Sequence, residues 1–311
     1  MQIILVAPRG FCAGVNMAID SLRRALELHG APVYVFHEIV HNRWVVDGFR
    51  AQGAVFVERL DDVPPGSVLL FSAHGVSPQV RSEAAQRRLR TIDATCPLVT
   101  KVHREAVRFA AEGYDVVLIG HAGHDEVVGV LGEAPDRIHL VQTADDVDRL
   151  RFPRDTKLAY LTQTTLSMDD AAEIIARLTQ RYPRIVGPAR ADICYATQNR
   201  QRVVGRWCRD ADIVLVIGSR NSSNSRRLAE LAAAQGVAAH LIDGPDDIHW
   251  DWFSEDQTVM ITAGASAPEE VVQRCVEALQ SRFRATVESR VLCREEVMFA
   301  LPEPLRDRPS A

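Results

Sequence analysis

The stretch Phe11-Cys12-Ala13-Gly14 decides the fold, because it opens a unit that occurs three times along the chain. It runs into residues 15–28, where apolar side chains recur at helical spacing until Gly30. Thr95-Cys96-Pro97 and Ile193-Cys194-Tyr195 each run into a further helical pattern. Three cysteines at the start of three equivalent helices indicate three related domains that each supply one thiolate.

Strands with polar ends follow each of these helices. The first apolar strand of each unit is expected at 33–36, 116–119 and 213–217, and a later one at 69–74, 158–164 and 259–266. Alternating strands and helices predict an α/β fold with mostly parallel sheets, in which ligands bind at the carboxyl ends of the strands. The polar side chains at these positions are His41, His74, His124, Glu126, Thr164, Ser222, Ser223, Asn224 and Ser266.

The repeat predicts the domain boundaries. The 311 residues divide into α/β domains at 1–96, 97–193 and 194–283, and residues 284–311 form a C-terminal tail. The first domain holds Cys12, Cys96 stands at the junction where the second starts, and the third begins at Cys194. We expect the three similar domains in a pseudo-threefold arrangement around the centre that the cysteines share.

Composition excludes several classes of partner. A net charge of −5 argues against nucleic acid or an anionic membrane as the main partner. No apolar run reaches the roughly 18 residues that a membrane span needs.

Residues 1–7 are expected to form a strand and carry no basic leader, so a cytoplasmic location is expected. No long heptad or large apolar helix face calls for a dimer, and a monomer is expected.

Cysteine chemistry narrows the kind of centre. The chain has six cysteines and no Cys-x-x-Cys pair, which disfavours a zinc ribbon or a thioredoxin-type pair. Cys208 and Cys275 lie among apolar residues at helical spacing and are expected in the core, whereas Cys293 is structural or exposed. Buried thiols are the simpler explanation for any single cysteine, but the threefold repetition argues against it. A helix start favours thiolates, which iron–sulfur clusters use as ligands, and three of them would leave one iron open.

The polar strand ends suit an anionic ligand. Hydroxyls, an amide and imidazoles favour a phosphate or diphosphate, although Ser222–Asn224 also precede a helix at 225–235 that one of them should cap. Glu126 is either an ordinary first-turn carboxylate or a proton source beside the anion. The histidines without such surroundings are interpreted as surface or packing residues: His29, His103, His139, His240 and His249.

Nine motifs in order resemble one family, the bacterial 4-hydroxy-3-methylbut-2-enyl diphosphate reductases, also called LytB or IspH. They include Pro8-Arg9-Gly10-Phe11-Cys12-Ala13-Gly14-Val15, Ser72-Ala73-His74-Gly75-Val76 and Asp93-Ala94-Thr95-Cys96-Pro97-Leu98-Val99. The others lie at 37–42, 120–126, 162–167, 192–197, 218–225 and 262–268. The resemblance extends from Met1 to about Pro302, with no departure at a functional position.

The resemblance implies the last reaction of the non-mevalonate isoprenoid pathway. The substrate, (E)-4-hydroxy-3-methylbut-2-enyl diphosphate, loses its hydroxyl by two-electron reduction and yields isopentenyl and dimethylallyl diphosphate. Cys12, Cys96 and Cys194 would hold a [4Fe–4S] cluster with its fourth iron open to the substrate. Thr164 and Glu126 would form the proton network at the hydroxyl. The diphosphate would bind His41, His74, His124, Ser222, Ser223, Asn224 and Ser266.

A ferredoxin or flavodoxin is implied as electron donor by the family alone. Three other classes stay open from the residues. A non-redox cluster dehydratase would also use three cysteines, a redox sensor would need no polar pocket, and a zinc-bound structural protein would be colourless.

Overall fold

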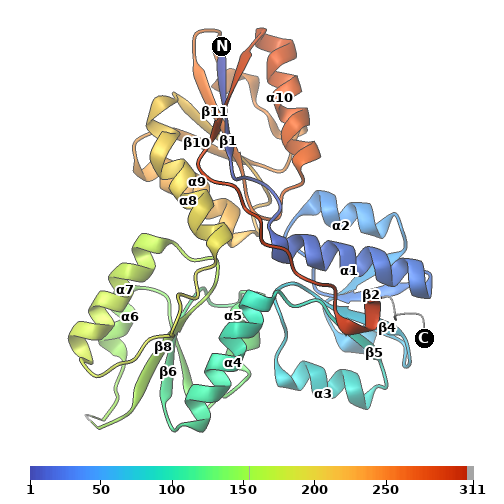
Figure 1. Cartoon of the computed structure of the whole chain (residues 1–311), viewed down its shortest axis with the longest axis vertical. Coiled ribbons are helices and arrows are strands. Elements are labelled where there is room, and N and C mark those ends of the chain that lie inside the picture. The colour runs from blue at the N-terminus through green and yellow to red at the C-terminus, as the bar shows by residue number, and fades with distance from the viewer. Residues whose placement is uncertain (154, 307–311) are drawn as a thin grey trace. The chain divides into compact units, whose positions relative to one another are not determined.

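The computed structural model describes residues 1–153 and 155–306 and confirms an α/β fold with three parallel sheets. The chain forms two compact units. One unit contains residues 1–16, 40–49 and 195–298, and the other contains residues 17–39, 50–194 and 299–306. Figure 1 shows the elements of both units along the chain.

The strands are short and mainly apolar. They are β1 (Gln2–Ala7), β2 (Val33–Phe36), β3 (Ala54–Val57), β4 (Val68–Phe71), β5 (Arg90–Asp93), β6 (Asp115–Ile119), β7 (Ile138–Val141), β8 (Leu158–Thr162), β9 (Ile213–Ile217), β10 (Ala238–Ile242), β11 (Thr258–Ala263) and β12 (Thr286–Val291). Every strand pairing within the described residues is parallel.

The helices include the three predicted after the cysteines. They are α1 (Ala13–His29), α2 (Arg43–Arg50), α3 (Pro78–Gln86), α4 (Pro97–Ala111), α5 (Asp125–Leu131), α6 (Ala144–Arg149), α7 (Met168–Arg181), α8 (Tyr195–Trp207), α9 (Ser223–Ala234) and α10 (Glu269–Phe283). Ser167 caps α7 by accepting a hydrogen bond from the Asp170 amide, as the sequence predicts. No helix of the described ranges is both long and apolar enough to cross a bilayer.

The sheets repeat one strand order, which accounts for the repeat in the sequence. The four-stranded sheet runs β3-β2-β4-β5, the three-stranded sheet β7-β6-β8, and the five-stranded sheet β10-β9-β11-β1-β12. A bridge between Ala159 and Val186 occupies the place beside β8 that β5 occupies beside β4. Strand β1 has the same place beside β11. Each of these three segments leads along the chain to one cysteine, Cys96, Cys194 or Cys12.

The structure differs from the predicted boundaries at both ends of the chain. Strand β1, assigned to the first domain, pairs with β11, with Gln2 opposite Thr258. Strand β12 lies within the predicted tail at 284–311 and pairs with the other edge of β1, where Gln2 is opposite Thr286. The sequence of β12 carries Glu288 and Arg290 and is almost wholly exposed, so hydrophobic alternation cannot reveal it.

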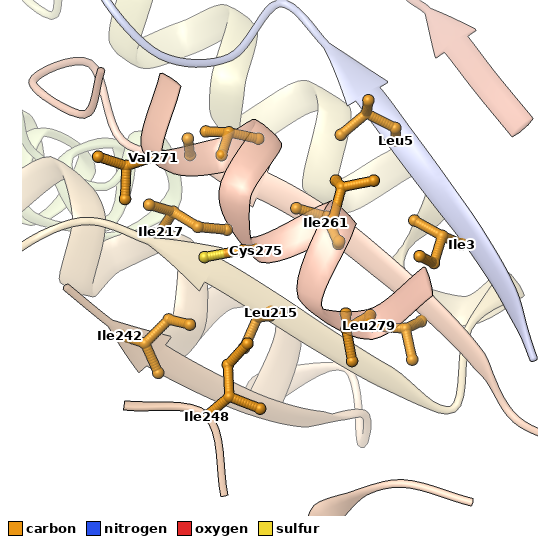
Figure 2. Packing of buried hydrophobic residues seen from close by; sticks show 14 of the residues in the cluster. Ile3, Leu5, Leu215, Ile217, Ile242, Ile248, Ile261, Val271, Cys275 and Leu279 are labelled. Atoms are coloured by element: carbon orange, nitrogen blue, oxygen red, sulfur yellow. The ribbon is translucent and has the colours of Figure 1, made fainter. Parts of the chain in front are cut away.

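Side-chain alternation in the five-stranded sheet builds a core on each face. Ile3, Leu215 and Ile261 point to the face that α10 covers, together with Cys275 of that helix (Figure 2). Their neighbours Ile4 and Val216 belong to the opposite core, beside α8 and α9. Successive strand residues point to opposite faces, so helices on both sides bury nearly every residue of the central strands. Cys208 and Cys275 have no exposed surface, and the prediction that they are core residues is confirmed.

We predict that Ile261→Ala lowers the free energy of unfolding by about 2–5 kcal/mol, because it leaves a cavity in a fully buried core. Val287→Ala on β12 is the matched control, since Val287 is 38% exposed, and it should cost no more than about 0.5 kcal/mol. Urea unfolding of both variants measures the difference. Equal losses would show that the β11 core does not stabilise this unit.

Candidate active site

Each of the three repeated cysteines is anchored to the end of a parallel strand. The backbone amide of Cys12 donates to the Ala265 carbonyl at 3.3 Å, just beyond β11. The Cys96 amide donates to Ala73 at 3.0 Å beyond β4, and the Cys194 amide to Thr164 at 3.1 Å beyond β8. In each case the acceptor is, or immediately precedes, a predicted ligand-binding residue: Ser266, His74 or Thr164. The same backbone hydrogen bond therefore fixes each of the three cysteines beside a polar residue at a strand end.

All three cysteines stand at the start of a helix, as predicted. Cys96 is the N-cap of α4, and its carbonyl accepts from the Thr100 amide at 2.9 Å. The Cys12 carbonyl accepts from Asn16 at 2.9 Å in α1, and α8 begins directly after Cys194. All six cysteines lie in the described part of the chain, and none forms a disulfide. The three are partly exposed, which suits thiols that bind a group, unlike the buried Cys208 and Cys275.

In the unit that contains Cys12, the polar residues converge on the ends of β9 and β11. The Ser266 hydroxyl donates to the His41 carbonyl at 2.9 Å. Ser222 caps α9 by accepting from the Ser225 amide at 3.3 Å, which confirms the predicted capping role. Ser225 was missed from the sequence: it has no exposed surface, and a Cβ at Gly264 would overlap its side chain. The start of α9 is therefore packed directly against the end of β11.

Two buried amide side chains in this region have atoms with no hydrogen-bond partner among the residues that the structure describes. Asn224 is 4% exposed, and neither its Nδ2 nor its Oδ1 has a hydrogen-bond partner among the residues that the structure describes. Asn42 caps α2 through Oδ1, which accepts from the Val45 amide at 3.2 Å, while its Nδ2 has no partner within 1–153 and 155–306. A buried polar group without a partner costs about 1–3 kcal/mol. Such groups are therefore expected to meet a ligand, which for Asn224 agrees with its predicted role.

In the unit that contains Cys96 and Cys194, His74 and His124 lie together at the ends of β4 and β6. Their rings are 5.9 Å apart and edge to face. The Nδ1 atom of His124 accepts from the Glu126 amide at 3.2 Å, so a neutral His124 carries its proton on Nε2. That nitrogen is then a donor, as binding of an anion requires.

Asp125 connects His74 with a histidine that the sequence did not single out. One carboxylate oxygen is 2.7 Å from Nδ1 of His37 and the other is 3.8 Å from Nδ1 of His74. The hydrogen bond to Asp125 raises the pKa of His37 against the opposing effect of burial. The Asp125 carboxylate therefore favours the protonated form of His37, and hence positive charge at this strand end.

Glu126 and Thr164 form a buried pair. The Thr164 amide donates to Oε1 of Glu126 at 2.6 Å, and the Thr164 hydroxyl lies 2.9 Å from Oε2. Glu126 is 2% exposed. Burial raises the pKa of Glu126 to about 7, although both contacts with Thr164 lower it, and the nearby charge of Asp192 raises it further. At neutral pH this carboxyl is close to half protonated, which fits a general acid better than an ordinary first-turn carboxylate.

A second ionic group, missed from the sequence, holds the segments around Cys96 and Cys194. Asp192 accepts from Lys101 Nζ at 2.6 Å and from the Thr162 amide at 2.9 Å. Lys101 also donates to Glu105 at 3.0 Å and to the Arg190 carbonyl at 2.7 Å. Burial raises the pKa of Asp192 to about 6. This pair ties helix α4, which Cys96 opens, to the residues just before Cys194.

Two of the histidines interpreted as surface or packing residues can be placed. His103 is 4% exposed and its Nδ1 is 2.6 Å from Glu133, so it packs inside the unit. His240 stacks on Trp252 with ring centroids 3.7 Å apart. Cys293 is partly exposed, in agreement with the interpretation that it is structural or exposed.

The fold and these side chains define an α/β protein with imidazoles, hydroxyls and a buried carboxyl gathered just past the carboxyl ends of its strands, as in an enzyme. The family model described as LytB protein matches residues 3–280. A protein of Rhodopirellula baltica named 4-hydroxy-3-methylbut-2-enyl diphosphate reductase is 61% identical over 98% of this chain and 96% of its own length. One of that name from Glaesserella parasuis is 53% identical over 98% of both chains.

A solved structure is also similar. The structure of the E-1-hydroxy-2-methyl-but-2-enyl-4-diphosphate reductase from Plasmodium falciparum matches with a TM-score of 0.95 and 41% identity, over 98% of this chain and 96% of that one. The chain belongs to the LytB family, which confirms the resemblance read from the nine motifs.

We predict that Glu126→Gln stabilises the fold increasingly as the pH rises from 5 to 8. Below pH 4.5 the carboxyl is protonated in both states. Between 4.5 and about 7 only the unfolded chain loses the proton, so the wild type becomes less stable, by about 3 kcal/mol in total. Glutamine matches the protonated acid in shape and does not titrate.

Urea unfolding at pH 5 and pH 8 measures this effect, with Glu112→Gln as control because Glu112 is 48% exposed. A stability difference between Glu126→Gln and wild type that is the same at both pH values would contradict a pKa near 7.

Proposed function

We propose that this chain is a 4-hydroxy-3-methylbut-2-enyl diphosphate reductase. Its substrate, (E)-4-hydroxy-3-methylbut-2-enyl diphosphate, takes up two electrons and two protons, the allylic C–O bond breaks, and water leaves. The products are isopentenyl and dimethylallyl diphosphate, at the last step of the non-mevalonate pathway. Family membership supports the activity, and the buried Glu126–Thr164 pair is the observation that carries its chemistry.

The diphosphate binds to donors at the strand ends. His41, Ser222, Ser223, Asn224 and Ser266 provide them in one unit, and His74 and His124 in the other. The buried amide of Asn224 supports this role, because it has no hydrogen-bond partner among the described residues and the ligand would supply one. The start of α9 adds backbone amides and the positive end of a helix dipole.

Glu126 delivers a proton to the leaving hydroxyl through Thr164. The two side chains already form a hydrogen bond at 2.9 Å, and the Thr164 hydroxyl can accept a proton from Glu126 while it donates its own. A carboxyl with a pKa near 7 can give up its proton as an acid and can take up another from solvent at neutral pH. Protonation converts hydroxide, a poor leaving group, into water.

Cys12, Cys96 and Cys194 hold a [4Fe–4S] cluster in this proposal. Three partly exposed thiols at helix starts fit such a group, because its thiolate ligands are anionic and need access to it. When bound, the cluster would supply the electrons and an iron site able to act as a Lewis acid. The iron–sulfur dependence of the LytB family supports the group. A ferredoxin or flavodoxin as electron donor, a monomeric state and a cytoplasmic location belong to the same proposal.

We predict that Glu126→Gln lowers kcat by about 10²- to 10⁴-fold and changes substrate binding little, since the amide keeps the contacts but cannot protonate the hydroxyl. Single turnover of the reduced protein and a substrate titration measure the two effects. Glu112→Gln should leave both unchanged. Unaltered turnover in Glu126→Gln would remove Glu126 from the proton path.

We predict that Cys12→Ser, Cys96→Ser and Cys194→Ser each abolish the brown colour and visible absorbance of anaerobically purified protein, because a hydroxyl replaces a thiolate ligand. Cys293→Ser is the control, since Cys293 is also partly exposed and should not be a ligand. Full colour in all three serine variants would show that these cysteines are not cluster ligands.

Product formation that needs no reductant would favour a dehydratase over a reductase.

A further inference from the structure

A fully buried arginine lies behind the loop that carries Cys12. Arg200 belongs to α8, the helix that begins directly after Cys194, and has no exposed surface. It is the largest of the side chains buried to this degree within the described residues. Buried guanidinium groups are rare unless they are paired. The partners of Arg200 therefore indicate what its charge and its five donors do.

Arg200 is bonded to the Cys12 loop and to the segment after β12. Its Nη2 and Nε donate to the Gly10 carbonyl at 2.7 and 3.2 Å. Its Nη1 donates to the Ala196 carbonyl at 2.9 Å. The Glu295 carboxylate pairs with it through three contacts of 3.1 to 3.3 Å. Glu295 also accepts from Asn199 Nδ2 at 3.0 Å, which holds the carboxylate against α8.

The loop around Cys12 depends on these contacts. Gly10 has a φ of +64°, a backbone conformation that favours glycine, and a Cβ there would lie 3.1 Å from the Ala267 carbonyl. Its amide donates to the Ala263 carbonyl at the end of β11 at 3.3 Å. Beyond Cys12, the Ala13 amide donates to the Tyr195 hydroxyl at 3.3 Å. Helix α8 thus holds the loop on both sides of the cysteine, through Arg200 before it and Tyr195 after it.

We propose that Arg200 and Glu295 are positioning residues that orient Cys12 toward its metal group and balance the charge beside it. The inference rests on the proposed function. Hydrogen bonds and charges behind the ligands set both the affinity of a metal site and its reduction potential. In the wild type the guanidinium of Arg200 and the carboxylate of Glu295 neutralise each other. Loss of either partner leaves the other charge uncompensated behind the loop that carries Cys12.

Three variants separate positioning from charge. Arg200→Met removes the fork and the charge, Arg200→Lys keeps only the charge, and Glu295→Gln keeps the shape but leaves the guanidinium uncompensated. The matched controls are Arg202→Met, an exposed arginine on the same helix, and Glu296→Gln, the exposed neighbour of Glu295. Iron and sulfide content, rate of cluster loss and midpoint potential are measured under anaerobic conditions.

We expect Arg200→Met to weaken cluster retention by about 10- to 100-fold relative to Arg202→Met. Arg200→Lys should restore part of this loss. Glu295→Gln should retain its cluster and shift the midpoint potential to a more positive value, which loss of fold stability alone would not produce.

Three outcomes would overturn the proposal. If Arg200→Met does not fold, the potential of Glu295→Gln decides, and a value equal to that of Glu296→Gln refutes the role. If the wild type holds a cluster and all three variants match their controls, the positioning role fails and the proposed function stands. A wild type without a cluster would refute both.

Discussion

The hydrogen bond from each cysteine amide to a carbonyl just past a strand end is the constraint on which the rest of the site depends. It recurs for Cys12, Cys96 and Cys194, with acceptors at Ala265, Ala73 and Thr164. Because each acceptor is at or next to a polar side chain of the site, the thiol and its polar neighbour are set together by backbone geometry. A parallel sheet makes this possible, since it gathers strand ends and helix starts at one edge.

Burial supplies the second requirement, control of charge. Helices cover both faces of the five-stranded sheet, and the same close packing in the other unit leaves Glu126 with almost no exposed surface. Burial is the main cause that raises its pKa to about 7, and the nearby charge of Asp192 adds to the rise. Around the thiols the ionic groups are paired: Lys101 with Asp192, and Arg200 with Glu295. Each pair joins a cysteine-bearing segment to its surroundings.

The sequence predicted the parts whose patterns are local. Apolar runs marked β2, β9 and the helices after the cysteines, and the repetition marked the thiols themselves. It could not place β1 beside β11, because pairing between strands some 250 residues apart leaves no local pattern, and the charged β12 lacks alternation. Asp125, Asp192 and Arg200 were missed for a related reason. Charged residues on helices and loops usually face solvent, and only the fold shows that these three face the site segments.

The most direct test of the account is Mössbauer spectroscopy of ⁵⁷Fe-labelled protein, purified without oxygen, before and after addition of the diphosphate substrate. The account predicts a cluster of about four iron atoms, of which one, the iron without a cysteine ligand, changes its signal when the substrate binds. Protein that holds no iron, or four iron sites whose signals do not change when the substrate is added, would contradict it.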